Sequence, residues 1–269
     1  INRFLSKMLI STDSVRTLSE TLQSSTETFC SGLYLSARWF VVSQLGYDDV
    51  QLIVLPDKDS AEYCAADLYN LIDGDLVFFL PDSGKSFEKS NYKSSLGVQR
   101  TSAVGKIIDN DGGPLYIVTY PSALSELIPD TGKISGSVLK MSVGDEIPHE
   151  DIVQKLFDSG FTRVDFVAEP GQFAVRGALI DIFSYSYNNP FRISFFGDEI
   201  ETISIFDCNS QLSKEKVQCA EIYPDLMSSE SVEGMIHISD ILPDDTLVWL
   251  DSSDMYKDKE FFPLLERFR

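Results

Sequence analysis

Basic residues and histidine are scarce in this chain. Its 269 residues include 22 Lys and Arg against 42 Asp and Glu, a net charge of −20, and only 2 His. A surface of that charge repels phosphate backbones, which argues against binding of bulk DNA by this chain alone. The composition therefore favours a binding module for a basic or mixed protein surface over a nucleic-acid enzyme.

Cysteine and long apolar runs are also scarce. No two cysteines have CxxC spacing, and no zinc site can be read from Cys30, Cys64, Cys208, Cys219, His149 and His237. Reduced thiols, and hence a cytoplasmic location, are the default expectation. No apolar run approaches the roughly 18 residues of a spanning helix, and INRFLSKMLI lacks the layout of a signal peptide, so we expect no membrane partner.

The richest pattern lies in residues 162–207, TRVDFVAEPGQFAVRGALIDIFSYSYNNPFRISFFGDEIETISIFD. Apolar and β-branched residues recur there at every second position, with Pro, Gly, Asn or Asp between the runs, which predicts a compact β-meander. We expect four strands, near 163–168, 173–183, 191–196 and 199–206. Gly197-Asp198 suits a tight hairpin turn in which Gly197 has positive φ.

This hairpin turn predicts a register and two faces. The register sets Phe196 opposite Glu199, Ser194 opposite Glu201, and Arg192 opposite Ile203. Period two gives a core face with Phe191, Ile193, Phe195 and Ile200, and a solvent face with Arg192, Ser194, Phe196, Glu199 and Glu201. An exposed aromatic beside an arginine is either a stray surface residue or part of a protein-binding patch, where both types are enriched.

Three motifs in the meander resemble a known family. VRGALIDIF at 175–183, FRISFFGDEIE at 191–201 and the following FD-x-x-SQ are similar to the element shared by the excision-repair protein UvrB and the transcription-repair coupling factors. In that family the element docks UvrA, the damage-sensing ATPase of nucleotide excision repair. The resemblance implies UvrA as partner, with Arg176, Arg192 and Phe196 as contacts. Ser194 departs from the family, which usually has an acid there.

Arg176 has an alternative interpretation. Its strand neighbours Ala174, Ala178 and Ile180 are apolar, so Arg176 is either a contact for the partner or half buried against an internal carboxylate.

Strands and helices alternate from residue 32 to 129. Apolar runs at 51–55 and 114–119 are typical of strands covered on both faces, and helical patterns follow them, which predicts a parallel α/β sheet. The segment 238–255 predicts a helix and one more strand that returns to this sheet. The resemblance implies that this part is the first, helicase-like lobe of the family.

The phosphate loop of that lobe is degenerate. Against the pattern G-x-x-x-x-G-K-[ST], Gly32 is present, but Ala37 replaces the second glycine, Arg38 the lysine and Trp39 the Mg²⁺-binding hydroxyl. Tight curvature around phosphate requires that second glycine, and a Trp obstructs the metal position.

The acidic end of the nucleotide site is degenerate too. Asp251 ends the last strand where a helicase carries an Asp-Glu pair, but Ser252 replaces the glutamate that activates water. We therefore expect neither ATP nor metal nor catalysis in this chain.

Together the patterns predict an α/β protein in two parts. Residues 1–134 with 225–269 form a degenerate helicase-like, P-loop-type lobe around a parallel sheet, resembling domain 1a of UvrB. Residues 135–224 form an inserted, mainly antiparallel β domain with a helix at 149–158, resembling domain 2. The expected function is recruitment of UvrA to lesions where RNA polymerase has stalled. The resemblance implies an ATP-dependent DNA translocase as full-length protein, which meets RNA polymerase and DNA through other parts.

Two other functions stay open. One is a nucleotide hydrolase with a divergent phosphate loop, and the other is a UvrB-type excision-repair subunit. UvrB inserts an aromatic-rich hairpin into its lobe, whereas the stretch 84–110 here carries only Phe87 and Tyr92, which favours a coupling factor.

Overall fold

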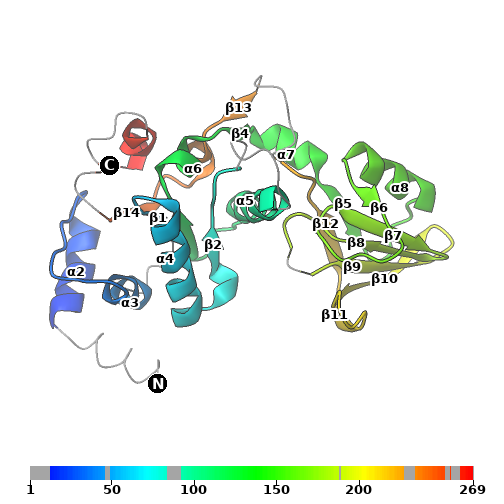
Figure 1. Cartoon of the computed structure of the whole chain (residues 1–269), viewed down its shortest axis with the longest axis horizontal. Coiled ribbons are helices and arrows are strands. Elements are labelled where there is room, and N and C mark those ends of the chain that lie inside the picture. Colours follow the sequence, from blue (N-terminus) through cyan, green and yellow to red (C-terminus); the bar gives the residue numbers. More distant parts are fainter. Residues whose placement is uncertain are drawn as a thin grey trace. The chain divides into compact units, whose positions relative to one another are not determined.

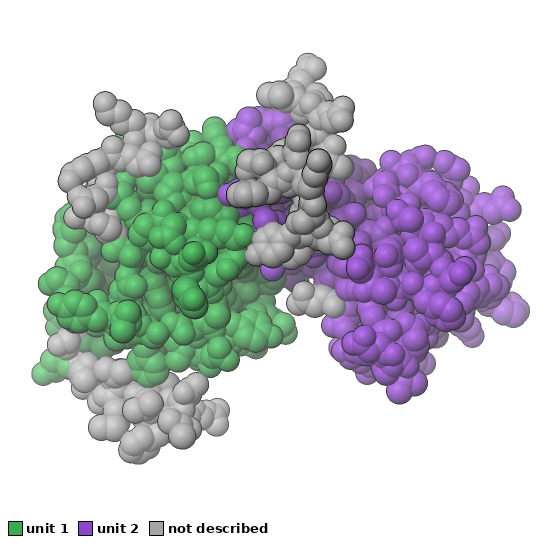
Figure 2. Space-filling view, in the orientation of Figure 1, with its two compact units in different colours: residues 1–81, 109–126, 237–269 green, residues 82–108, 127–236 purple. Residues whose placement is uncertain are grey.

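The structure of the chain, a computed structural model, describes residues 13–45, 49–83, 92–187, 189–226, 234–251, 255 and 261–268 (Figure 1). Ser252 and Phe87, singled out in the sequence, lie outside these ranges, as does the side chain of Tyr92. The chain forms two compact units, unit 1 with residues 1–81, 109–126 and 237–269, and unit 2 with residues 82–108 and 127–236 (Figure 2). The expected domain boundaries stay a prediction; the units differ from them mainly at residues 82–108.

Unit 1 is built on a parallel sheet of four strands in the order β14-β1-β3-β2. The strands are β1 Val50–Val54, β2 Val77–Phe79, β3 Leu115–Thr119 and β14 Leu247–Leu250. Every residue of β1 and β3 is buried, as expected of central parallel strands. The predicted parallel sheet, and the return of the last strand to it beside β1, are confirmed.

The longer helices of unit 1 bury the apolar residues that lie along one side of each helix. They are α2 Asp13–Ser24, α3 Ala37–Gln44, α4 Lys58–Leu71 and α6 Pro121–Ser125, with 3-10 turns η1 Gly74–Leu76, η2 Ile238–Ile241 and η4 Phe262–Phe268. Helix α4 begins after Asp57, whose carboxylate accepts a hydrogen bond from the Ser60 amide at 2.8 Å. The helix expected within 238–255 is only the short turn η2, because Pro243 disfavours helical backbone at Leu242, which is extended.

Unit 2 is built on a sheet of six strands in the order β11-β10-β9-β8-β7-β6, antiparallel except between β6 and β7. The strands are β6 Thr162–Arg163, β7 Gln172–Arg176, β8 Leu179–Ile182, β9 Phe191–Phe196, β10 Glu199–Phe206 and β11 Ser213–Val217. Helix α8, His149–Asp158, has the predicted bounds and covers one face, where Ile152 and Leu156 join the main core with Phe195 (Figure 1).

Two more helices and two small sheets complete the described part of unit 2. They are α5 Tyr92–Ile108, α7 Thr131–Ser137, and two-stranded sheets of β4 Ile128–Pro129 with β13 Met235–Ile236 and of β5 Leu139–Ser142 with β12 Cys219–Ile222. Among the helices that the structure describes, none is long and apolar enough to cross a membrane.

The strand expected at 173–183 is wrong: it is a hairpin. Gly177, with φ of 60°, turns the chain between β7 and β8. A residue without Cβ adopts this conformation at little steric cost, so a lone glycine inside an alternating run marks a turn here. The strand expected at 163–168 is also shorter than predicted and ends at Arg163.

The predicted register of the last hairpin is correct only at its tip. Gly197 has the expected positive φ of 64°, and Phe196 pairs with Glu199. A β-bulge between Ile200 and Thr202 then shifts the pairing, so that Ser194 lies opposite Thr202 and Arg192 opposite Ser204. The extra residue, Glu201, has no partner on β9. The shift turns Ile203 into the core, where it is fully buried.

Candidate functional site

The face of the meander away from α8 is the candidate site. The residues predicted for the core face, Phe191, Ile193, Phe195 and Ile200, are all buried. Phe196, next along β9, points the opposite way and is 79% exposed. The face assignment is therefore confirmed for the core residues and for Phe196.

Arg192 is less exposed than a residue on a solvent face. A small second core of Val167, Ala174, Phe183 and Phe206 covers one end of this face. The Arg192 guanidinium lies 4.3 Å from the centre of the Phe206 ring, and the side chain is 19% exposed. The uniform solvent face is thus a wrong prediction: period two gives the face of a residue but not what packs on that face.

Asp181 holds Arg192 in place. This carboxylate is 1% exposed and accepts hydrogen bonds from Nε and Nη2 of Arg192 at 2.7 and 2.9 Å. The two bonds form a bidentate pair, the strongest geometry for a guanidinium and a carboxylate. The hydrogen bond that Arg192 donates to Asp181 raises the pKa of Arg192 above its ordinary value, although burial opposes this.

A turn at 207–211 accepts a further hydrogen bond from the Arg192 guanidinium. The Asp207 carboxylate accepts a hydrogen bond from the Ser210 amide at 2.9 Å, and Gln211 takes a φ of 60°. The Gln211 carbonyl then accepts from Nη1 of Arg192 at 3.1 Å. Hydrogen bonds from Ser210, and the Lys214 ammonium 3.1 Å away, lower the pKa of Asp207 to about 2.

Arg176 on β7 contacts Asp181 on the adjacent strand β8. Its Nη2 forms an ion pair with Oδ2 of Asp181, and its side chain is 35% exposed. The prediction that Arg176 is half buried against an internal carboxylate is confirmed. On its other side the guanidinium lies 5.1 Å from the centre of the Phe166 ring, and Phe166 is 63% exposed. Phe166 was not among the predicted contact residues, although an aromatic side chain at this position was a usable signal.

The residues predicted to mark a degenerate nucleotide site pack within the chain. Gly32 has a φ of 85°, and Ala37 begins α3. Trp39, at the position of the metal-binding hydroxyl, is buried among residues of the sheet and α4. Arg38 stacks over the Trp39 ring at 4.8 Å and forms an ion pair with Asp251. The charged groups of the two predicted ends of that site, Arg38 and Asp251, thus pair with each other.

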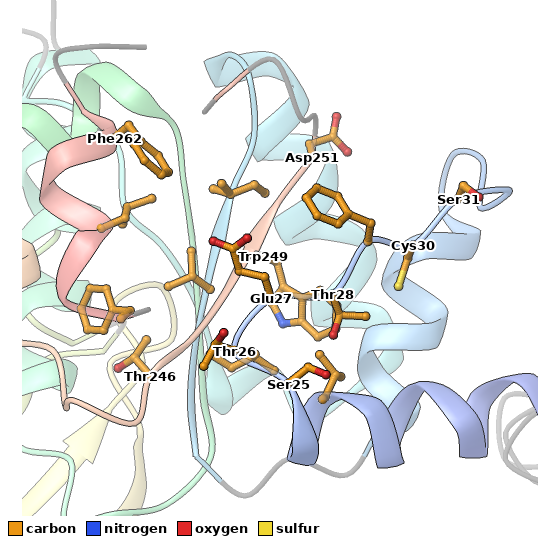
Figure 3. A pocket seen from close by; sticks show the side chains of 17 residues that line it. Ser25, Thr26, Glu27, Thr28, Cys30, Ser31, Thr246, Trp249, Asp251 and Phe262 are labelled. Carbon is orange, nitrogen blue, oxygen red and sulfur yellow. The ribbon is translucent and has the colours of Figure 1, made fainter. Parts of the chain in front are cut away.

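A cavity of about 470 Å³ lies along β14 in unit 1 (Figure 3). The segment 25–31, strand β14 and η4 line it, and Glu27 and Asp251 are its carboxylates. Its described lining residues include no Lys or Arg, so they supply no cation for a triphosphate. Within the described part of the chain, no three His, Cys, Asp or Glu residues are grouped so as to hold a metal ion.

Part of unit 2 is similar to a known protein domain. Residues 139–226 match the model of the UvrB interaction domain. These residues contain the meander, α8 and both arginines of the candidate site.

The relatives include transcription-repair-coupling factors and a UvrABC system protein B. The factor of Mycobacterium bovis is 34% identical over 189 residues, which is 66% of this chain and 15% of the relative. The factor of Bacillus subtilis is 27% identical over 201 residues, 74% of this chain and 17% of the relative. UvrABC system protein B of Helicobacter hepaticus is 39% identical over 85 residues, 31% of this chain and 13% of the relative.

The resemblance inferred from the sequence is thereby confirmed: the chain is similar to transcription-repair-coupling factors and has a match to the UvrB interaction domain. These similarities connect the chain with DNA repair. The aligned region spans about 15–17% of the length of these two coupling factors.

Proposed function

We propose that this chain is a protein-docking module that recruits UvrA in transcription-coupled nucleotide excision repair. The observation that carries the proposal is the Phe196 ring, 79% exposed on the sheet face that also bears Arg176 and Arg192, within a segment that matches the UvrB interaction domain. Exposed aromatic and arginine side chains on a rigid sheet are the residue types that dominate binding energy at protein interfaces.

The full-length protein would supply the remaining steps. In this proposal an ATP-dependent translocase displaces a stalled RNA polymerase on DNA, and the present module presents the lesion to UvrA. Contacts with RNA polymerase and DNA belong to parts of the protein outside this chain.

The docking proposal is tested by titrating purified UvrA against the chain and two neighbouring variants. Phe196→Ala should weaken binding by about 1–3 kcal/mol and leave the melting temperature nearly unchanged, because Phe196 is 79% exposed. Phe195→Ala, one position earlier and buried in the core, should lower the free energy of unfolding by about 3–5 kcal/mol. Wild-type affinity in Phe196→Ala, with a normal melt, would place the docking site elsewhere.

We also propose that unit 1 neither binds nor hydrolyses ATP. The ion pair between Arg38 and Asp251, and the buried Trp39, support this because they occupy the positions that the phosphates and the metal would need. Isothermal titration of the chain with Mg·ATP should give no heat of binding, and a matched titration with UvrA reports that the chain is folded. Micromolar affinity for Mg·ATP would instead favour a nucleotide hydrolase with a divergent loop.

A further inference from the structure

The two arginines beside Asp181 use their donors differently. Arg192 donates from Nε and Nη2 to Asp181, from Nη1 to the Gln211 carbonyl and from Nη2 towards the Gln211 side chain at 3.4 Å. All three nitrogens of this guanidinium are therefore engaged within the chain. Arg176 donates from Nη2 to Asp181, and the described residues offer its Nε and Nη1 no further acceptor. Arg176 is the arginine with donors left for a partner.

The charges leave the cluster positive. Two guanidinium groups share one buried carboxylate, so one positive charge is uncompensated on a chain whose net charge is −20. A guanidinium with free donors binds a carboxylate or a phosphate in a planar, bidentate geometry. The overall charge opposes a nucleic-acid phosphate, which favours a carboxylate on a protein.

Phe166 completes the exposed part of this cluster. Its ring covers one face of the Arg176 guanidinium, and a stacked ring leaves the N–H edge of a guanidinium open. The loop that carries it is well anchored. Val167 is buried in the second core, and Gln172 Oε1 accepts hydrogen bonds from the amides of Ala168 and Glu169 at 2.9 and 3.1 Å. A large exposed ring on an anchored loop loses little entropy on binding.

We propose that Phe166 and Arg176 together recognise a carboxylate of an acidic segment of UvrA, with Arg192 acting as a positioning residue through Asp181. The proposal rests on the proposed docking of UvrA. It extends the surface on both sides of the arginine pair, with Phe166 at one end and Phe196 at the other. Arg192, which holds Asp181 in this cluster, lies four residues from Phe196 on β9, about 13 Å, so the arginine cluster and Phe196 can engage two separate features of one partner.

The experiment is a titration of UvrA against the whole chain and a set of variants. Phe166→Ala and Arg176→Ala should each weaken binding about fivefold to thirtyfold, and the double variant by much less than the product, because one side chain supports the other. Arg176→Lys should not restore affinity, since an ammonium does not stack or bind bidentately. Tyr63→Ala is the matched control: it removes a ring 76% exposed on α4 of unit 1, and binding should be unchanged.

The salt dependence of binding separates the contribution of the Arg176 charge from that of the Phe166 ring. If Arg176 meets a carboxylate, wild-type affinity falls as ionic strength rises, and Arg176→Ala shows a flatter dependence while Phe166→Leu keeps the wild-type slope. Phe166→Leu also keeps an apolar side chain on the loop should Phe166→Ala fold poorly. If the wild type binds UvrA and both Phe166 variants match it, this inference is wrong and the docking proposal stands. If the wild type does not bind UvrA, the docking proposal itself fails.

Discussion

Arg192 and Arg176 share one carboxylate but should contribute differently to stability. Arg192→Ala removes the bidentate pair and leaves the buried Asp181 with one partner, so the free energy of unfolding should fall by about 1.5–3 kcal/mol. Arg176→Ala removes a half-exposed ion pair and should cost about 1 kcal/mol or less. Urea denaturation of the two variants measures the difference, and equal losses would show that the two arginines are equivalent supports.

The face of the sheet on which a single side chain lies could be predicted from the sequence. Period two correctly separates Phe195 from Phe196, because adjacent strand residues point to opposite faces. It could not show that Phe206 lies under Arg192, since that contact depends on the bulge at Glu201, which sets Ser204 rather than Ile203 opposite Arg192. Phe166 was missed because the alternation in 163–168 predicted a strand there, whereas the strand ends at Arg163 and Phe166 lies in the loop that follows.

The turn at 207–211 is an element that depends on pH. The native pKa of Asp207 is about 2, below the unfolded value near 3.9, so its contacts stabilise the folded chain above about pH 4 and are lost as the pH falls towards 2. NMR titration of the Asp207 carboxyl carbon should show a midpoint near pH 2, and Lys214→Met should move it upward. A wild-type midpoint near pH 4 would contradict this account of the turn.

At the scale of elements, types were predicted better than connections. Helix α8 and the return of β14 to the parallel sheet followed from apolar stripes and runs, whereas the place of β14 beside β1 did not. The hairpin at Gly177 and the bulge at Glu201 did not, because both insert a change of direction into an otherwise regular alternation. The bulge in turn decides that Ile203 is core. Sequence alternation alone does not fix strand register past such an inserted residue.

The net charge of the whole molecule should prevent binding to nucleic acid. With a net charge of −20, the chain should show negligible affinity for duplex DNA at physiological salt, since counterion release requires cationic contacts. A gel shift with labelled duplex measures this, with UvrA alone as the positive control. Saturation at low micromolar concentrations of the chain would show a local basic surface that outweighs the overall charge.

The parallel sheet of unit 1 joins residues that are far apart in the chain. The Trp249 indole N–H on β14 donates to Gln51 Oε1 on β1 at 2.9 Å, across 198 positions, and all of unit 2 lies between them. Every residue of unit 2 is therefore synthesised before β14. Until residue 250 emerges, the nascent chain carries VQLIV with one strand edge unpaired, a template for association with other chains. Translation that pauses before this point should make the protein dependent on chaperones.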